Sequence, residues 1–572
     1  MKYYLIALAY ACCHLVEAQT ITLRDVHPQS LEVRAFQVTQ NTNLEISGTG
    51  GVFRDDYKLL IYYGWILDSK TRRVVWHAYD DIRDRDDLED ERGKYDISES
   101  IQLSPGTYEL YFTGAHHSYG WGGEWGIEDL GDLLEEIFST RERNDFRRSV
   151  QEDLFVQVRG DGVKEVEIGD ALGSNLKDAI AYFVRAKDEE LFEQGFALSD
   201  DTNLRLYAVG EGRKDAIFDY MWIYDANTRE RVFEMSYRNT RYAGGAEKNI
   251  KLDETIELPA GAYVISYRTD DSHAYGKWNA LPPDDPQFWG VAVYPATTAD
   301  KANIIPYKAP KTLEPVVELT RVRNYELVSK GFDVKKDMDL RILCIGERGH
   351  DDEMADYGWI VDADTRETVW KMRPYRSERA GGAEKNRLVN DKIKLPKGKY
   401  IAYYRTDGSH AYNSWNSSRP DDEEHWGITL WAVDEADLSA ISYFDEDSYT
   451  ASNVVVEINM ISDRDYRRER FSLENTTKIT VIAMGEGSDG RMNDTAWIKN
   501  MDTGRIVWEM DYYETEHAGG ARKNRRVTET ITLPSGDYSV YYESDGSHSF
   551  SRWNAPPPDD PQSYGVRVLV SE

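Results

Sequence analysis

The sequence contains very little cysteine. Only Cys12, Cys13 and Cys344 occur in 572 residues. The first two lie in the N-terminal stretch MKYYLIALAYACCHLVEAQT, whose single lysine, apolar run and small-residue ending predict a secretory signal peptide over residues 1–18. A lipoprotein signal cut before Cys12 is the alternative. Removal of residues 1–18 would leave one cysteine, which excludes an intramolecular disulfide and predicts domains held together by apolar packing.

Positive charge is scarce as well. The chain carries 69 Lys and Arg against 102 Asp and Glu, a net charge of −33. This balance argues against nucleic acid or an anionic membrane as a partner, because phosphate groups would be repelled, and it favours cations. Beyond the N-terminal stretch no apolar run is long enough to cross a bilayer. We therefore predict no membrane span and a secreted, extracellular or periplasmic location, in a bacterium.

What the sequence does contain is a repeat. Trp222, Trp359 and Trp497 stand in similar surroundings at nearly equal spacings. Each is followed by an Ala-Gly-Gly block, a Leu-Pro-x-Gly-x-Tyr block and a string of the form Asp-x-Ser-His…Trp-Asn…Pro-Asp-Asp. Repetition at this period predicts one structural module per copy, with limits at 176–296, 314–434 and 452–572.

A fourth, less complete copy precedes these three and is predicted at 19–160. It keeps the Trp-Ile block and a Leu-Ser-Pro-Gly-x-Tyr block but lacks the Ala-Gly-Gly, Trp-Asn and Pro-Asp-Asp elements. It also carries an insert at about 128–148, whose leucine spacing predicts a helix.

Within each copy the hydrophobic period is two. In the segment YVISYR, Tyr263, Ile265 and Tyr267 point to one side and the intervening residues to the other. Short runs of this kind, separated by Asp, Asn, Gly and Pro turns, recur along every module. The predicted fold class is therefore all-β, with tandem antiparallel β-sandwich modules of the jelly-roll or immunoglobulin-like kind.

The repeated string supplies the candidate ligand-binding residues. They are Asp270, His273, Trp278, Asn279, Asp407, His410, Trp415, Asn416, Asp545, His548, Trp553 and Asn554. A hydrolase triad is disfavoured, because adjacent Ser and His point to opposite sides of an extended segment and no Gly-x-Ser-x-Gly elbow accompanies them. We assign no catalytic residue, and a hydrolase with an unrecognised carboxylate pair is the third interpretation of function.

A metal site is one alternative for the string. Its Pro-Asp-Asp ends supply Asp284, Asp285, Asp421, Asp422, Asp559 and Asp560 as candidate ligands. One histidine per module is too few for zinc, whereas calcium takes six to eight oxygen ligands. The upstream strings GEGRKDAIFDY, GERGHDDEMADY and GEGSDGRMNDT add further acids, including Asp219, Asp356 and Asp494. Ca²⁺ is therefore the candidate cofactor.

Sugar binding and a structural role are the other two alternatives. The Trp-Asn pairs are residue types found in carbohydrate sites, and repetition would raise avidity. Alternatively the string staples a long loop to the sandwich, with the Trp filling the core and a lysine of the Ala-Gly-Gly block meeting Asp270 or Asp284. The candidate structural residues are Gly244, Gly245, Lys248, Gly381, Gly382, Lys385, Gly519, Gly520 and Lys523.

These features predict a secreted, multivalent binding or adhesion protein built from repeated β-sandwich modules. Its expected partner is a polysaccharide or another envelope protein. The alternative is a calcium-stabilised structural or scaffold protein of the cell envelope.

Overall fold

The computed structural model describes residues 19–27, 30–53, 59–79, 94–114, 154–214, 216–311, 313–350, 353–446 and 449–570. The predicted signal peptide and the predicted helical insert at 128–148 lie outside these residues. The chain divides into two compact units, Met1–Lys311 and Thr312–Glu572. Each unit contains two groups of strands, and each group encloses its own cluster of buried apolar side chains. We refer to these groups as modules 1 to 4.

Module 1 is a nine-stranded arrangement in the order β1-β8-β3-β4-β7-β2-β9, with β5 paired to β4 and β6 paired to β3. Its strands are β1 (Thr20–Arg24), β2 (Leu31–Val38), β3 (Thr42–Phe53), β4 (Leu59–Asp68), β5 (Arg73–His77), β6 (Lys94–Leu103), β7 (Gly106–Thr113), β8 (Phe155–Arg159) and β9 (Val163–Val166). Helix α4 (Ile168–Leu176) leads into module 2.

Module 2 has two sheets, in the orders β10-β19-β12-β17-β16 and β15-β14-β18-β11-β20, with β13 paired to β12. Its elements are β10 (Ala181–Val184), β11 (Leu191–Leu198), β12 (Thr202–Arg213), β13 (Ala216–Ile217), β14 (Tyr220–Asp225), β15 (Arg231–Glu234), β16 (Arg241–Tyr242), β17 (Asn249–Leu258), β18 (Gly261–Arg268), η1 (Pro286–Phe288), β19 (Gly290–Pro295), α5 (Thr298–Ala302) and β20 (Ile304–Ile305).

Module 3 has the strand order β21-β29-β23-β24-β28-β22-β30, with β25 paired to β24, β27 paired to β23 and β26 paired to β27. Its elements are β21 (Val317–Thr320), β22 (Leu327–Val334), β23 (Met338–Arg348), β24 (Met354–Asp362), β25 (Thr368–Lys371), η2 (Pro374–Arg376), β26 (Glu378–Arg379), β27 (Asn386–Leu395), β28 (Gly398–Arg405), η3 (Glu423–His425), β29 (Gly427–Ala432), η4 (Glu435–Ala440) and β30 (Ile441–Phe444).

Module 4 has sheets in the orders β31-β40-β33-β38-β37 and β32-β39-β35-β36, with β34 paired to β33. Its elements are β31 (Val454–Ile458), β32 (Tyr466–Leu473), β33 (Thr477–Ser488), β34 (Arg491–Met492), β35 (Thr495–Asn500), β36 (Ile506–Glu509), η5 (Tyr512–Glu514), β37 (Glu516–His517), β38 (Asn524–Leu533), β39 (Gly536–Glu543), η6 (Pro561–Ser563) and β40 (Gly565–Val570).

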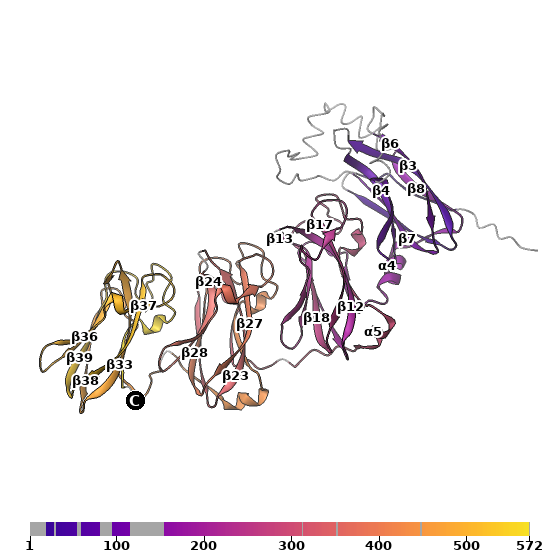
Figure 1. Cartoon of the computed structure of the whole chain (residues 1–572). Coiled ribbons are helices and arrows are strands. Elements are labelled where there is room, and N and C mark those ends of the chain that lie inside the picture. Colours follow the sequence, from indigo (N-terminus) through magenta and orange to yellow (C-terminus); the bar gives the residue numbers. More distant parts are fainter. Residues whose placement is uncertain are drawn as a thin grey trace, which may run out of the picture. The chain divides into compact units, whose positions relative to one another are not determined.

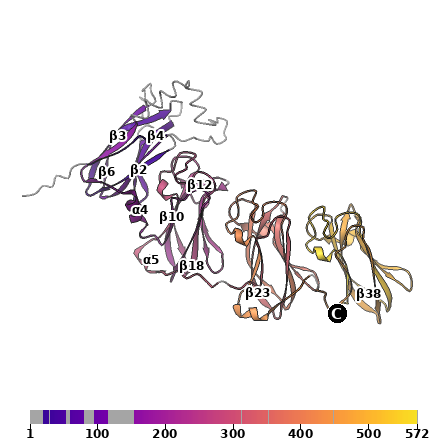
Figure 2. The same cartoon turned by 180° about the vertical axis from the view of Figure 1, so that it is seen from behind.

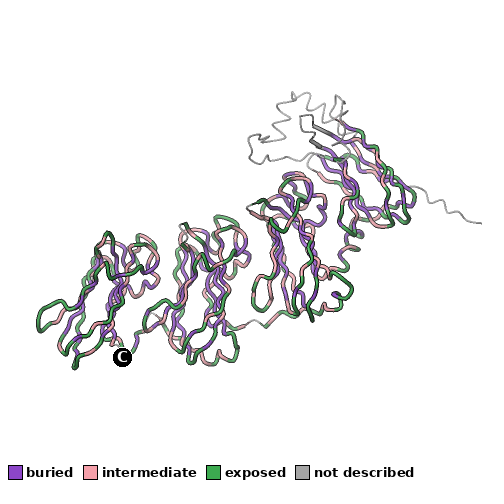
Figure 3. The backbone as a smooth tube through the Cα atoms, in the orientation of Figure 1, coloured by how far each residue is buried: buried purple, intermediate pink, exposed green. Residues whose placement is uncertain are grey.

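The prediction of an all-β, antiparallel sandwich fold is confirmed. Figures 1 and 2 show facing layers of strands in each module, and in Figure 3 the buried residues concentrate on those strands. The Leu-Pro-x-Gly-x-Tyr block has a specific role in this fold. The Tyr400 hydroxyl donates to the carbonyl oxygen of Pro396, and Tyr263 and Tyr538 make the same bond to Pro259 and Pro534. This local bond fixes the turn before the last long strand of each module.

Residues outside the predicted limits of modules 1 to 3 form short edge strands. In module 1, β9 pairs with β2; in module 2, β20 pairs with β11; in module 3, β30 pairs with β22. In module 4, β32 is the counterpart of β2, β11 and β22, and it pairs only with β39 among the described residues. The module limits stay predictions. Residues outside them contribute strands to the sheets of modules 1 to 3. No described helix is both long and apolar enough to cross a membrane.

Candidate functional site

The histidine of the repeated string is buried in modules 2 to 4 and lies between two asparagines. In module 3, His410 Nε2 is 2.6 Å from Asn386 Oδ1, and its Nδ1 is 3.0 Å from Asn416 Oδ1. The Asn386 Nδ2 donates to the carbonyl oxygens of Gly381 and Ser418, so its Oδ1 is the atom that faces the imidazole. The same surroundings hold the other two histidines, His273 and His548.

These histidines are structural bridges. Burial, with the Lys385 ammonium nearby, lowers the pKa of His410 to about 4, and burial beside Lys523 lowers the pKa of His548 to about 4. Both imidazoles are therefore neutral near pH 7, and in each only one of the two ring nitrogens donates to its asparagine oxygen. Because their ring nitrogens face asparagine oxygens, the Ser-His part of the string does not form a nucleophile and base pair.

The tryptophan of the string packs against the histidine and not outward as an open platform. Trp278 is 8% exposed and meets His273 edge to face at 5.2 Å and Trp289 at 5.0 Å. Trp415 and Trp553 are half-buried and pack in the same way, against His410 with Trp426 and against His548 with Tyr564. Their ring faces are largely occupied by the protein itself.

The two glycines of the Ala-Gly-Gly block accommodate the end of the string. In module 2 both have positive φ, 88° at Gly244 and 68° at Gly245. A Cβ on Gly244 would overlap the carboxylate of Asp284, and one on Gly245 would overlap the carbonyl oxygen of Pro282. The corresponding pairs in modules 3 and 4 have the same conformation and the same neighbours: Gly381 and Gly382, Gly519 and Gly520.

The lysine of the same block links the string to a glutamate. Lys248 Nζ donates to Asn279 Oδ1 at 2.7 Å and lies 3.2 Å from Glu211. The sequence predicted Asp270 or Asp284 in this place. The equivalent bonds in the later modules join Lys385 to Asn416 and Glu347, and Lys523 to Asn554 and Glu486.

The Pro-Asp-Asp end of the module 2 string docks on module 1. Arg72, in the turn between β4 and β5, donates from Nε to Asp285 Oδ2 at 2.9 Å, and it also pairs with Glu109 at 2.6 Å. The Trp65 indole nitrogen donates to the carbonyl oxygen of Asp284 at 2.7 Å. Arg72, Glu109 and Asp285 are all buried. The Asp285 carboxylate, a candidate metal ligand from the sequence, thus binds a guanidinium, and the Asp284 carboxylate lies against Gly244.

Module 4 docks on module 3 through the equivalent Arg–Asp pair, with different partners for the preceding aspartate. Arg366 Nε donates to Asp560 Oδ2 at 2.7 Å, while Asp559 accepts from Lys371 at 2.6 Å and from the Tyr357 hydroxyl at 2.9 Å. Burial opposes ionisation of Asp560, but the Arg366 guanidinium holds the pKa of that carboxyl below its usual value. In module 3 itself, Asp422 accepts from His425, and the Asp421 carboxylate lies against Gly381.

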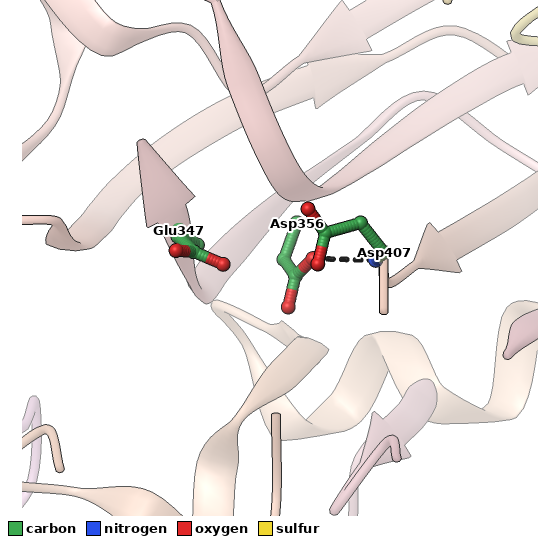
Figure 4. Close-up of side chains that lie close together, drawn as sticks. All are labelled: Glu347, Asp356 and Asp407. Atoms are coloured by element: carbon green, nitrogen blue, oxygen red, sulfur yellow. Dashed lines mark hydrogen bonds between the residues drawn. The ribbon is translucent and has the colours of Figure 1, made fainter. Parts of the chain in front are cut away.

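A different set of carboxylates converges in module 3. Glu347 lies in β23, Asp356 in β24 and Asp407 directly after β28, and oxygens of all three lie within 4.8 Å of one another (Figure 4). The Asp407 backbone N–H donates to Asp356 Oδ1 at 2.7 Å. Module 4 has the equivalent triad of Glu486, Asp494 and Asp545. Among the described residues, none of the six Pro-Asp-Asp carboxylates belongs to such a cluster.

Several oxygens of these triads are buried without a hydrogen-bond partner. They are Glu347 Oε2 and Asp356 Oδ2 in module 3 and Glu486 Oε2 in module 4. Buried carboxylate oxygens are normally paired, because their desolvation is costly. Burial, together with the neighbouring carboxylates, raises the pKa of Asp356 well above its usual value and that of Asp494 to about 7. One lysine per triad does not balance three carboxylates.

The module 3 triad opens onto a hollow of about 540 Å³. The hollow is lined by Glu347, Asp407, Ser409, Lys385, Asn416 and His350, among others. The structure therefore brings together three residues of the sequence prediction, Asp407, Asn416 and Lys385, with an accessible space beside the carboxylates. This space can admit an ion together with water.

The same three positions are occupied differently in modules 1 and 2. In module 2 the corresponding residues are Glu211, Asp219 and Asp270; the Asp270 N–H donates to Asp219 Oδ1 at 2.8 Å, and burial raises the pKa of Glu211 to about 7. In module 1 the strand registers place Gly51 and Tyr62 at the positions of Glu347 and Asp356. The third position falls on Ala115, which lies outside the described residues. The copy without the repeated string therefore lacks two of the three acids.

The glutamate of each triad was not among the candidate ligands predicted from the sequence. Its signal was present, because the upstream strings repeat Gly-Glu before the acidic turn in all three modules. What the sequence could not indicate is that this glutamate and Asp407, remote along the chain, meet across β23, β24 and β28.

Comparison with known proteins adds little. No protein-family model matches the chain, and no curated protein matches it. Among solved structures, the human MASP-1/3 CUB1-EGF-CUB2 domain is similar over 45% of this chain and 97% of its own, at 10% identity and a TM-score of 0.14. A mycobacterial arabinofuranosyltransferase, AftD, is similar over 91% of this chain and 40% of its own, at 7% identity and a TM-score of 0.10. At these TM-scores neither similarity bears on function.

Proposed function

We propose that this chain is a secreted, multivalent binding protein in which modules 2, 3 and 4 are each stabilised by one Ca²⁺. The ion would be held by the triads of Glu347, Asp356 and Asp407 and of Glu486, Asp494 and Asp545. In module 2 it would be held by the equivalent residues Glu211, Asp219 and Asp270. The observation that carries the proposal is the set of buried, unpartnered carboxylate oxygens in modules 3 and 4. A divalent cation would satisfy them and balance their charge.

The ligand chemistry favours calcium over zinc and magnesium. All three protein ligands of a triad are carboxylates, which are hard oxygen donors, and no cysteine or histidine belongs to either cluster in the described residues. Mg²⁺ requires near-octahedral geometry and gives up water reluctantly, whereas Ca²⁺ accepts irregular shells of six to eight oxygens. The hollow beside Asp407 leaves room for the water molecules that would complete such a shell.

The multivalent role is supported by the repetition of the module. Four modules with related folds present related loops several times on one chain, which raises avidity without a tight single site. The predicted signal peptide supports a secreted or periplasmic location, where calcium is available at millimolar concentration. A polysaccharide or another envelope protein is the partner that we propose. A calcium-stabilised scaffold remains the alternative, and it shares the same triads.

The decisive experiment is a count of bound calcium. After equilibrium dialysis of the full chain, metal analysis should find three Ca²⁺ per chain, because module 1 has Gly51 and Tyr62 in place of two of the three acids. The variants Asp356→Asn and Asp494→Asn should each lower the count by one. The matched control Glu469→Gln removes an exposed carboxylate of β32 and should leave three.

The thermal response separates specific binding from general screening of the acidic chain. At a calcium concentration ten times Kd, each site should add about 1.4 kcal/mol to the free energy of unfolding. Magnesium at equal ionic strength should add much less. Equal responses to the two ions, with both Asp variants behaving like the parent chain, would reject the calcium sites.

A further inference from the structure

One face of the sheet that contains β4 and β7 in module 1 is a docking surface. A stacked pair, Trp65 and Tyr111, lies at its centre with ring centroids 5.0 Å apart and planes at 9°. Both side chains are fully buried, and the loop that covers them ends in Asp284 and Asp285 of module 2.

The same face of module 3 is covered in the same way. Trp359 and Tyr403 stack at 5.2 Å and 9°. Both are buried, and the Tyr403 hydroxyl donates to Gln562, next to the Pro-Asp-Asp segment of module 4. In each unit, therefore, the Trp-Tyr stack of one module receives the acidic loop of the next.

Module 4 has the same stack, but its face is open among the described residues. Trp497 and Tyr541 stack at 5.2 Å and 5°. Tyr466 of β32, 58% exposed, lies 6.2 Å from Trp497 and 6.1 Å from Tyr541. Trp497 is itself half-buried, whereas Trp359 is fully buried. We call Tyr466, Trp497 and Tyr541 the module 4 platform.

The residues around the platform do not fit another Pro-Asp-Asp loop. In module 3 the loop is held by Arg366, Lys371 and Arg405. The strand registers place Glu509 where module 3 has Lys371, and Glu543 where it has Arg405. Gly504 occupies the turn position of Arg366. An acidic loop would meet two carboxylates there and lose its guanidinium partner.

The platform instead combines aromatic rings with hydrogen-bonding groups of both kinds. Across the sheet, Glu509 and Arg468 flank the Trp497–Tyr541 stack, because β36, β35, β39 and β32 align them in one row. Glu543 lies beside Tyr466 in the next row. Carboxylates accept hydrogen bonds and the guanidinium donates them. Exposed aromatic patches with such a polar rim mark binding sites.

We propose that the module 4 platform binds a neutral polysaccharide. The apolar C–H faces of its sugar rings would pack on Tyr466 and Trp497, and its hydroxyls, which both donate and accept, would meet Glu509, Glu543 and Arg468. A strongly charged ligand of either sign would face a like charge on this rim. The inference rests on the proposed binding function, because it names the ligand class, but none of the platform residues is a triad carboxylate.

The test is affinity electrophoresis of the full chain in gels that contain soluble polysaccharides. The neutral probes are laminarin, dextran, xylan and galactomannan, and alginate and heparin are the anionic probes. We expect retardation by at least one neutral probe, with or without EDTA. Trp497→Ala and Tyr466→Ala should each weaken that binding at least tenfold. Tyr513→Ala, which removes an 80% exposed tyrosine elsewhere on module 4, is the control and should bind normally.

Three results would overturn the inference. They are no retardation by any neutral probe, retardation that survives both platform variants, or retardation by the anionic probes alone. Because Trp497 packs on Tyr541, thermal unfolding of Trp497→Ala is measured alongside, and the more exposed Tyr466→Ala decides the outcome if that variant unfolds. Binding of a synthetic PPDDPQ peptide to the platform would show that an acidic loop is the occupant. Failure here leaves the calcium count unaffected, so the two proposals fail separately.

Discussion

Asp494 illustrates how a single buried carboxyl can make stability depend on pH. Burial, with Asp545 and Glu486 nearby, raises its pKa from 3.8 to about 7 in the folded chain. Between these values the folded state holds a proton that the unfolded state releases. The stability that this group contributes is therefore complete below pH 3.8 and is lost as the pH rises through 7.

We predict that, in EDTA, the melting temperature of the full chain falls between pH 5.5 and pH 8, and that it falls less in Asp494→Asn. Calcium competes with the same proton, so its stabilising effect should be larger at pH 8 than at pH 6. Scanning calorimetry at several pH values measures both. A parent chain and variant with identical pH profiles would contradict the raised pKa.

Substitution of two glycines of module 4 would distinguish the effect of backbone strain from that of steric overlap. Gly519 and Gly504 both have positive φ, 84° and 71°. A Cβ on Gly519 would overlap the Asp559 carboxylate, whereas one on Gly504 would meet nothing within 4 Å. We predict that Gly519→Ala lowers the melting temperature by several degrees and that Gly504→Ala has a small effect. Comparable losses in the two variants would show that positive φ alone limits both positions.

The roles of single residues were only partly predictable from the sequence. The string correctly indicated that His273, Trp278 and the Ala-Gly-Gly block act together in one place. It did not indicate which acids meet, because Asp284 and Asp407 have the same chemistry in the sequence. Their burial and neighbours differ: Asp284 of module 2 contacts Trp65 of module 1, and Asp407 lies beside Asp356 of its own module.

At the scale of elements, the period-two pattern predicted the strands but not what covers them. In β28, Tyr400, Ala402 and Tyr404 face the core of module 3 and are buried, as the alternation indicates. The residues that point the other way are buried too, including Tyr403 at 1% and Arg405 at 8%. The loop of module 4 covers the side of the sheet on which Tyr403 and Arg405 lie, and no local pattern in β28 predicts that contact.

The docking turn gives a prediction at this scale. Arg366, in the turn between β24 and β25, pairs with Asp560 in a buried site. Arg366→Ala would leave Asp560 buried and without its guanidinium, which should cost about 3–5 kcal/mol. Urea unfolding of the full chain measures the loss.

The companion variant is Arg366→Met combined with Asp560→Leu. Replacing both charges by apolar side chains should cost much less than removing one, because no isolated charge remains. A double variant that is as unstable as Arg366→Ala would show that the hydrogen bonds themselves, and not the isolated charge, carry the stability.

For the whole molecule, the repeats predicted four modules, whereas the structure groups them as two compact units. Each unit contains a buried Arg-Asp pair, Arg72 with Asp285 or Arg366 with Asp560. The partners stand far apart along the chain, so neither string alone reveals the pairing. Only the fold, by placing a turn of one module against a loop of the next, makes it visible.

We therefore predict two cooperative thermal transitions and not four, because the two modules of a unit share a buried ion pair. Arg366→Ala should split one transition into two and leave the other unchanged. Calorimetry of the full chain in EDTA gives the answer. Four separate transitions in the parent chain would mean that the buried pairs do not couple the modules.

The charges on the docking faces also give the chain a direction. A face with Arg366, Lys371 and Arg405 accepts an acidic loop, whereas a face with Gly504, Glu509 and Glu543 does not. Modules 3 and 4 therefore cannot exchange places in the chain without loss of the docking contacts. A shuffled gene in which module 4 precedes module 3 would set the Asp421–Asp422 loop against two glutamates, and that junction would stay loose. Anyone who lengthens or reorders such an array must transplant the turn and its facing strands along with the fold.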